Sequence, residues 1–481
     1  MSMGKNTVWL TTTKIINTVI TMLITMLLSR FRTLEEYGTF SQINIITTVV
    51  TTVFALGLPN CVNFFLNRTE KKEEKQDFLS AYFTLGTIIS IIIAVILFIA
   101  FPLLTSFFKN DALNDYKFAV LMFPWVNLFN SSVENIYIAY NKINLLIAYR
   151  MSYAVILLVT VSIFSAVGGS FYVYMIVYMA LQAVFVLLLY ITSYIISGKI
   201  RFNFDKKIIS EILKYSIPLG ISSIISTLNI ELDKIMVGRM FTMEDLAIYT
   251  NVAKELPINI LTISVTALLL PKMVSLIQGK KESTAVDLWG TSILISSIII
   301  CFVNMLLFVL SDSVIGVLYS EKYLPGNAIF KVYTITSLVK ITSWQIILVS
   351  TKNTKKILHI AIIALSVNFV LNLIFMNLFG MIGAAFATMI SEFMSVCIKI
   401  YVSSKAIGYS FGKMIPWMKI LAIIVLNIIL GVLIYGVYNL FKIIIDNIYI
   451  GAFISGLVAL IIYAFIIIKP FKILWKKMNA F

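Results

Sequence analysis

The feature that most constrains this chain is a series of apolar runs that recur from one end to the other. Each run is about 20 residues long, which as a helix spans the roughly 30 Å hydrocarbon core of a bilayer. Of the 481 residues, 60% are hydrophobic and only 12% are charged, whereas an average soluble domain is about one quarter charged. The sequence therefore predicts an all-α polytopic membrane protein.

We predict about fourteen transmembrane helices joined by short segments, without a folded domain outside the membrane. The first apolar run begins close to the N-terminus and lacks a small-residue cleavage site, so we expect no signal peptide. The predicted spans are 6–29, 40–66, 78–105, 118–141, 146–168, 171–197, 209–238, 246–278, 287–311, 327–350, 357–379, 381–404, 414–441 and 447–468.

One stretch of sequence occurs twice, and it divides the chain. Segment 29–40 reads SRFRTLEEYGTF and segment 238–249 reads GRMFTMEDLAIY. Both contain an Arg, a Thr before an acidic pair, a small residue and a closing aromatic, and each joins two apolar runs. Such duplication is common in transporters, whose substrate path lies between the repeats. We therefore predict two pseudo-symmetric six-helix bundles and two appended C-terminal helices, with domain limits of 1–200, 201–408 and 409–481.

The net charge of +16 indicates membrane topology rather than a nucleic-acid partner. Lys and Arg gather in alternate connecting segments and beside them, such as 68–75, 142–150, 199–214 and 469–477. Because cytosolic loops carry the excess of Lys and Arg, we expect both termini in the cytosol. The three Cys residues show no pair spacing, and we expect neither a disulfide nor a metal site.

Several ionisable residues fall inside the predicted spans, where each costs about 3 kcal/mol on insertion scales and needs a partner, water or a function. For any one of them a structural ion pair or a snorkelling side chain remains open. As a set they suggest a hydrated cavity, with cations that bind an anionic substrate and acids that couple transport to H⁺ or Na⁺. The cationic candidates are Lys14, Arg30, Arg239, Lys254 and Lys340, and the acidic candidates are Glu134, Asp233, Glu255 and Glu392.

Pro218 and Gly220 lie near the start of the seventh span and form a candidate hinge, although a static kink fits them equally. Thr33 and Thr242 precede the two acidic pairs and are in helix-capping positions, which we favour over a metal-dependent glycosyltransferase site. Phosphate-binding Gly-rich loops and the common hydrolase and zinc signatures do not occur. We expect neither a cofactor nor enzymatic activity.

Segment 30–38, Asp233 with segment 244–249, and the small-residue step 380–385 resemble the polysaccharide-export branch of the multidrug/oligosaccharidyl-lipid/polysaccharide (MATE-like) superfamily. The resemblance implies a Wzx-type flippase in the cytoplasmic membrane of a bacterium. Such proteins move undecaprenyl-pyrophosphate-linked oligosaccharide to the outer leaflet for O-antigen, capsule or lipopolysaccharide biosynthesis. It also implies two six-helix bundles in a V around a positively charged cavity, with polymerase and chain-length proteins as possible membrane partners.

Three other functions remain open at this point. A cation-coupled multidrug antiporter has the same fold, and so does a lipid II flippase. An O-antigen polymerase or lipid-dependent glycosyltransferase generally needs a substantial outer loop, which this chain lacks. The flippase is favoured because sugar and pyrophosphate cannot cross hydrocarbon, whereas a polyprenyl tail can remain in it.

Overall fold

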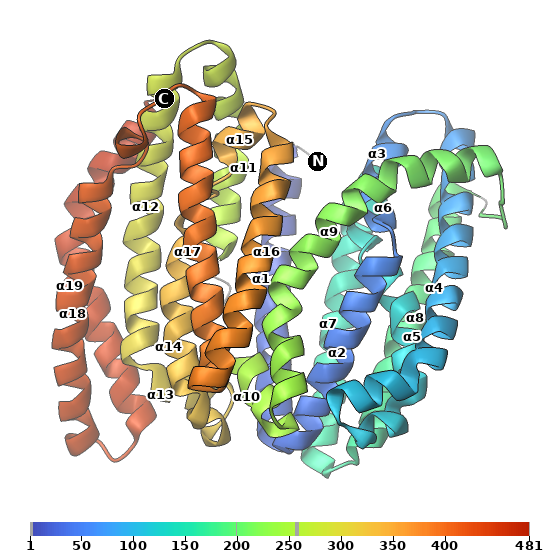
Figure 1. Ribbon diagram of the computed structural model, residues 1–481, viewed down its shortest axis with the longest axis horizontal. Coiled ribbons are helices and arrows are strands. Elements are labelled where there is room, and N and C mark those ends of the chain that lie inside the picture. The colour runs from blue at the N-terminus through green and yellow to red at the C-terminus, as the bar shows by residue number, and fades with distance from the viewer. Residues whose placement is uncertain (1–2, 199, 255–258, 481) are drawn as a thin grey trace. The chain divides into compact units, whose positions relative to one another are not determined.

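The computed structural model describes residues 3–198, 200–254 and 259–480, and within these ranges the chain is helical and contains no strand (Figure 1). The chain divides into two compact units, Met1–Ala247 and Ile248–Phe481. The boundary falls inside α10 (Met243–Val252), beyond the repeat boundary that we predicted near residue 200. The three predicted domains stay a prediction, because a sequence repeat and a packing unit divide a chain on different grounds.

The first unit consists of long helices packed side by side. Helix α1 packs along α7, and α9 packs against α2, α3 and α4. Stacked aromatic rings fill the space between α4, α5 and α8, as with Phe83 and Phe129, whose ring centroids are 5.3 Å apart. The elements are α1 (Met3–Phe31), α2 (Leu34–Phe54), α3 (Leu58–Asn67), α4 (Lys72–Phe108), η1 (Asp111–Tyr116), α5 (Lys117–Asn130), α6 (Val133–Ala139), α7 (Ile143–Val167), α8 (Phe171–Ser197) and α9 (Lys206–Met240).

The second unit is built around α12, its most buried long helix. The appended pair α18 and α19 packs on α12, where the Tyr463 hydroxyl donates to the Ile298 carbonyl at 2.7 Å. The elements are α11 (Asn259–Gln278), α12 (Glu282–Val309), α13 (Ser311–Leu318), η2 (Glu321–Gly326), α14 (Asn327–Thr336), η3 (Ser337–Ile341), α15 (Ile346–Ser350), α16 (Thr354–Phe379), α17 (Met381–Ala406), η4 (Phe411–Lys413), α18 (Trp417–Ile444) and α19 (Ile448–Asn479).

Helical structure occupies all fourteen predicted spans within the described residues, so the predicted fold class is confirmed. Of these segments, 11 are long and apolar enough to cross a membrane as single helices, or 12 with the pair α2 and α3 counted as one span bent by 51°. The two that fall short are the broken segments α5–α6 and α10–α11. The chain is a polytopic α-helical membrane protein.

The two copies of the repeated motif begin helices in the same way. Thr33 caps α2, its hydroxyl accepting from the Glu36 N–H at 3.1 Å while the Glu36 carboxylate accepts from the Thr33 N–H at 3.1 Å. At the start of α10 the Thr242 hydroxyl accepts from the Asp245 N–H at 3.1 Å, and the Asp245 carboxylate accepts from the Thr242 N–H at 3.2 Å. Both are reciprocal capping boxes, so the predicted capping role is confirmed.

Candidate functional site

Three charged side chains meet in the first unit. Lys14 of α1 places its Nζ 2.8 Å from Glu134 Oε1, and Arg150 of α7 places its Nη2 2.7 Å from Glu134 Oε2. Each carboxylate oxygen therefore receives its own cation, and the group keeps a formal charge of +1. We call Lys14, Glu134 and Arg150 the α1–α6–α7 cluster.

The local fold explains why these three residues meet. Helices α6 and α7 are joined by a tight turn, in which Asn141 adopts the left-handed conformation with φ of 55°. Glu134 and Arg150 lie equally far from Lys142 in the sequence, so on the two sides of the turn they reach the same depth. Helix α1 packs along α7 and brings Lys14 to the carboxylate from the other side.

The two cations of the cluster combine a position within membrane-spanning helices with exposed charge. Lys14 lies five residues beyond Trp9, where the described apolar stretch of α1 begins, and Arg150 lies inside α7. The exposed side-chain fractions are 55% for Lys14, 34% for Arg150 and 27% for Glu134. A charged group that is exposed within a membrane span has to face water or a polar ligand, because facing hydrocarbon is costly. The geometry suits a hydrated, cationic binding surface.

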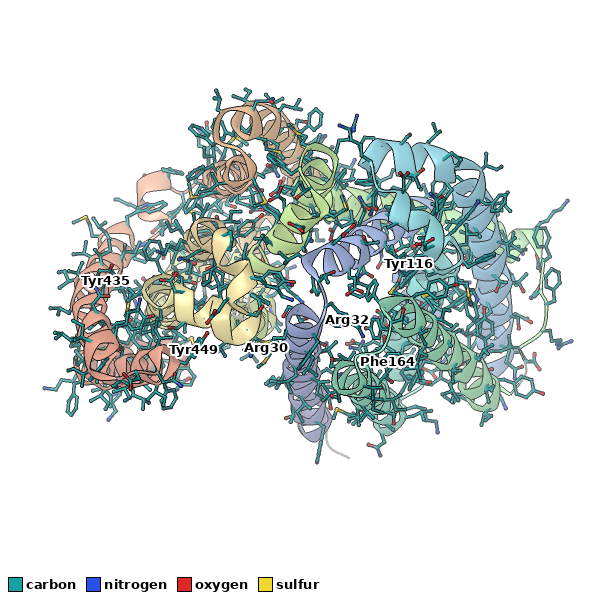
Figure 2. All side chains as sticks on the ribbon, turned by 90° about the horizontal axis from the view of Figure 1, so that it is seen from below. Arg30, Arg32, Tyr116, Phe164, Tyr435 and Tyr449 are labelled. Atoms are coloured by element: carbon teal, nitrogen blue, oxygen red, sulfur yellow. The ribbon has the colours of Figure 1, made fainter. Side chains whose placement is uncertain are left out.

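The end of α1 carries two arginines with different surroundings (Figure 2). Arg30, a predicted site residue, is exposed in the last turn. Arg32 is buried, donates from Nη1 to the Gly169 carbonyl at 2.6 Å, and stands over the Tyr174 ring with 5.6 Å between Cζ and the centroid. Arg32 therefore ties the end of α1 to the α7–α8 connection.

Helix α9 carries two further predicted site residues. Arg239 is half-buried in its last turn, with Cζ 5.3 Å from the centre of the Phe107 ring, and among the described residues its buried Nη1 has no hydrogen-bond partner. Asp233 is buried, with 3% of its surface exposed. The two ion pairs that define the α1–α6–α7 cluster involve neither of these residues.

In the second unit the predicted Lys340 and Glu392 lie in η3 and α17, and both are half-buried. Lys399, two turns after Glu392 on α17, is within electrostatic reach of both. The backbone carbonyl of Lys340 accepts a hydrogen bond from the Thr262 hydroxyl. Lys254 is exposed just after α10. Glu255, the remaining predicted site residue, lies outside the described residues.

The predicted hinge residues Pro218 and Gly220 lie inside α9, where it passes the bend between α2 and α3. At that bend Gly57 has φ of +73°, and a Cβ on it would come within 2.5 Å of the Gly220 nitrogen. A Cβ on Gly220 would meet the Leu56 carbonyl carbon at 2.7 Å. The backbones of α9 and of the bend are in direct contact, which only glycine allows at these positions.

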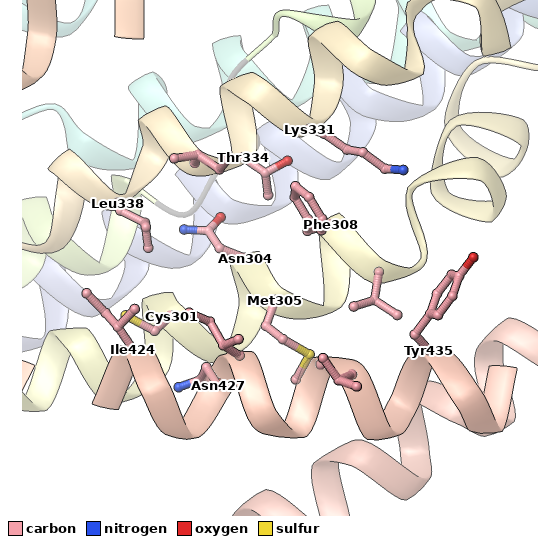
Figure 3. Close-up of a pocket in the computed structure, with 15 residues that line it drawn as sticks. Cys301, Asn304, Met305, Phe308, Lys331, Thr334, Leu338, Ile424, Asn427 and Tyr435 are labelled. Atoms are coloured by element: carbon pink, nitrogen blue, oxygen red, sulfur yellow. The ribbon is translucent and has the colours of Figure 1, made fainter. Parts of the chain in front are cut away.

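A cavity of about 700 Å³ lies within the second unit between α12, α14 and α18 (Figure 3). Its wall is mainly apolar, and Lys331 with Tyr435 lies toward one end, as Figure 3 shows. Two buried amides also line it. Asn304 has an Nδ2 and Asn427 an Oδ1 without a hydrogen-bond partner among the described residues.

Sequence reasoning missed Arg150 and Arg32 as residues of interest. Arg150 was counted among the cytosolic charges although it falls within the predicted span 146–168, and the structure places it inside α7, paired with Glu134. Part of the signal was present in the sequence, because an acid and a base equally far from a helix–helix turn lie at the same depth. For Arg32 we find no such signal, since its partner is a backbone carbonyl far along the chain. No group of three or more His, Cys, Asp or Glu side chains able to hold a metal ion occurs in the described part of the chain.

Comparisons with known proteins agree with the resemblance found in the sequence. The family model described as "Polysaccharide biosynthesis protein" matches residues 27–327. No curated protein sequence matches the chain. The fold is similar to a solved structure titled lipid II flippase MurJ, inward closed conformation, with a TM-score of 0.74 and 17% identity over 95% of this chain and 98% of that one.

A second similar structure is the inward-facing conformation of a multidrug resistance MATE family transporter of the MOP superfamily. Its TM-score is 0.62, with 13% identity over 82% of this chain and 94% of that one. At these identities the two likenesses establish the fold. The family match covers more than half of the chain, and the chain belongs to the polysaccharide biosynthesis protein family.

Proposed function

We propose that this protein is a flippase rather than an enzyme. It moves polyprenyl-pyrophosphate-linked oligosaccharide from the inner to the outer leaflet of the bacterial cytoplasmic membrane for O-antigen, capsule or another surface polysaccharide. Both termini face the cytosol in this proposal, as the distribution of Lys and Arg along the sequence predicts. The substrate's sugar and pyrophosphate travel through a hydrated path while its tail remains in lipid.

The observation that carries the proposal is the exposed, net positive α1–α6–α7 cluster, whose two cations lie on the membrane-spanning helices α1 and α7. A pyrophosphate needs cationic partners once it leaves water, and Lys and Arg are its ordinary partners in proteins. Outward movement of an anion from a negative cytosol is favourable by roughly 2.3 kcal/mol per charge for each 100 mV. Arg30, Arg239, Lys254 and Lys340 are proposed as further cations along the path, and Asp233, Glu255 and Glu392 as candidate groups for H⁺ or Na⁺ coupling.

The proposal is tested in proteoliposomes that contain a radiolabelled undecaprenyl-pyrophosphate oligosaccharide in both leaflets. Membrane-impermeant periodate oxidises the sugars of the outer leaflet only, about half of the total without a flippase. With the wild-type protein we expect nearly all of the sugar to become accessible over time. A plateau at one half with well-folded protein would refute the function.

Two variants test the assignment of the cations. Lys14→Ala and Lys340→Ala should each slow the gain in accessibility at unchanged protein level, because each removes a charge that faces the headgroup. Parallel vesicles with lipid II and with ethidium test the two alternative transport functions. Flipping of lipid II alone would assign the chain to the lipid II reaction, and ethidium efflux alone would assign it to drug export.

A further inference from the structure

We propose that Glu134 is an internal substitute for the substrate's phosphate. In this structure the Glu134 carboxylate forms ion pairs with Lys14 and Arg150. An incoming phosphate displaces the carboxylate and forms ion pairs with the same two cations. The inference rests on the proposed function, because it states how the same cationic surface receives an anionic headgroup and releases it again.

The geometry is that of two cations sharing one anion. Glu134 Oε1 is 2.8 Å from Lys14 Nζ and Oε2 is 2.7 Å from Arg150 Nη2, so the two oxygens are used separately. Two nonbridging oxygens of a phosphate bind two cations in the same way, through charge-assisted hydrogen bonds. Phosphate and carboxylate therefore compete for the same two cations, because the carboxylate already reduces their combined charge from +2 to +1.

The three side chains differ in their exposed fractions. Lys14 is 55% exposed and Arg150 is 34% exposed, whereas Glu134 is the most enclosed at 27%. A headgroup can therefore reach the cations before it reaches the carboxylate. Glu134 stands in the first turn of α6, a helix of only seven residues that ends in turns on both sides. A short element of this kind allows the carboxylate to move without unpacking a long helix.

The competition has a direct consequence for transport. A pair of cations without a carboxylate would bind pyrophosphate more tightly, yet tight binding slows release on the other side of the membrane. A carboxylate that returns to the same cations lowers the affinity and favours release, because a group affects a binding equilibrium only by its different interaction with the bound and empty states. Glu134 thus sets the affinity of the site rather than contributing to binding.

The test uses full-length protein in detergent and inorganic pyrophosphate as the probe, with binding measured by isothermal titration calorimetry. Glu134→Gln should bind pyrophosphate about ten-fold more tightly than wild type, since the competing charge is gone. Glu134→Asp retains the charge but is too short to reach both cations, and we expect about three-fold tighter binding. The Asp variant keeps the test valid if the Gln variant does not fold.

Glu231→Gln is the matched control, because Glu231 is also an intramembrane acid in an ion pair, 3.0 Å from Lys234 on α9, outside the cluster. It should leave the affinity for pyrophosphate at the wild-type value. Arg150→Gln should weaken binding in the wild-type background and also in the Glu134→Gln background, where no carboxylate remains to explain the loss.

Equal or weaker binding of pyrophosphate by both Glu134 variants would overturn the inference. The inference would also be overturned if Glu134→Gln bound pyrophosphate with unchanged affinity and its transport no longer depended on an ion gradient. That result would make Glu134 a coupling acid. The readout in detergent is independent of transport. Tighter binding together with no movement of lipid-linked sugar in vesicles would sustain the role of Glu134 and refute the proposed function instead.

Discussion

The two copies of the repeated motif begin their helices identically but pack differently. In both, a Thr and an acid three residues later form a reciprocal capping box, at Thr33 and at Thr242. Five residues after each Thr the first copy has Gly38, whereas the second has Ala247, which is fully buried. A Cβ placed on Gly38 would lie 2.0 Å from the Met243 carbonyl oxygen. The first copy thus rests directly on the backbone of the second.

The difference separates two kinds of constraint. A capping box is formed by side chains and backbone groups within four consecutive residues. Because it does not depend on what packs around the helix, both copies can form it. The glycine is required by a segment about two hundred residues away, so nothing in its own helix accounts for it. An interior helical glycine costs about 1 kcal/mol relative to alanine, and here the close contact with Met243 explains why it is tolerated.

The largest expected effect comes from adding a side chain at this contact. Gly38→Val should lower the free energy of unfolding by about 3 kcal/mol or more, because α2 and α10 have to move apart to admit it. The measurement is thermal unfolding of the detergent-purified protein, followed by intrinsic fluorescence. Gly436→Ala is the control, since Gly436 lies in α18 with open space around its Cβ position. It should raise stability by about 1 kcal/mol. Equal effects of the two substitutions would mean that the close contact does not form.

A second backbone contact joins Gly57, at the bend between α2 and α3, to α9. A Leu-Pro pair follows the first copy of the motif at 58–59 and the second at 270–271. Pro59 lies in the first turn of α3, whereas Pro271 lies inside α11. Gly57→Ala should lower the free energy of unfolding by about 2 kcal/mol, because the new side chain is strained by the positive φ and also collides with the backbone of α9. Gly168→Ala separates the two parts, because Gly168 has φ of +68° and nothing near its Cβ position. We expect about half the loss there, and an identical loss at both sites would exclude a contribution from α9.

The fourteen spans and both caps could be predicted because each depends on neighbouring residues. Apolar length fixes a span, and a Thr followed by an acid three positions later fixes a cap. The helix ends inside segments 117–139 and 243–278 were not predicted, although polar residues lie beside them, Ser131 and Ser132 in the first and Asn251 and Lys254 in the second. Polar residues also occur within unbroken spans, so their presence alone did not locate the end of a helix.

The candidate site shows the same division. That Lys14 and Glu134 need partners follows from the cost of charge in the membrane, and the structure provides the partner by pairing them. The choice of that partner was not predictable, because α1 and α6 are distant in the sequence. Arg150 was missed for a simpler reason, since its closeness to Lys142 led to its being counted as a cytosolic charge although it lies in the predicted span 146–168. Depth in a helical hairpin is measured from the turn, and this rule would have matched it to Glu134.

A smaller effect is expected at the two caps, where the copies are alike. Thr33→Ala and Thr242→Ala should each lower the free energy of unfolding by about 1 kcal/mol, because each leaves a first-turn N–H without its acceptor. Thr→Ser at either position should restore most of the loss. The double Ala variant should differ from the sum of the two, because α2 contacts the backbone of Met243, the residue after Thr242. A strictly additive double variant would show that the two caps act independently of this contact.

The smallest expected effect distinguishes the two boxes from each other. In the second copy the Asp245 carboxylate also accepts from the Thr242 hydroxyl at 2.8 Å, a hydrogen bond that Glu36 does not make in the first. Glu36→Gln keeps a side-chain acceptor and loses only the attraction of a negative charge to the helix N-terminus, about 0.5 kcal/mol. Asp245→Asn loses that attraction and also weakens the hydroxyl bond, so its cost should be about 1 kcal/mol. In the same unfolding assay, Asp245→Asn should lower the free energy of unfolding more than Glu36→Gln does. The reverse order would mean that the capping box of the first copy contributes more to stability, where the Gly38 contact holds the helix start in place.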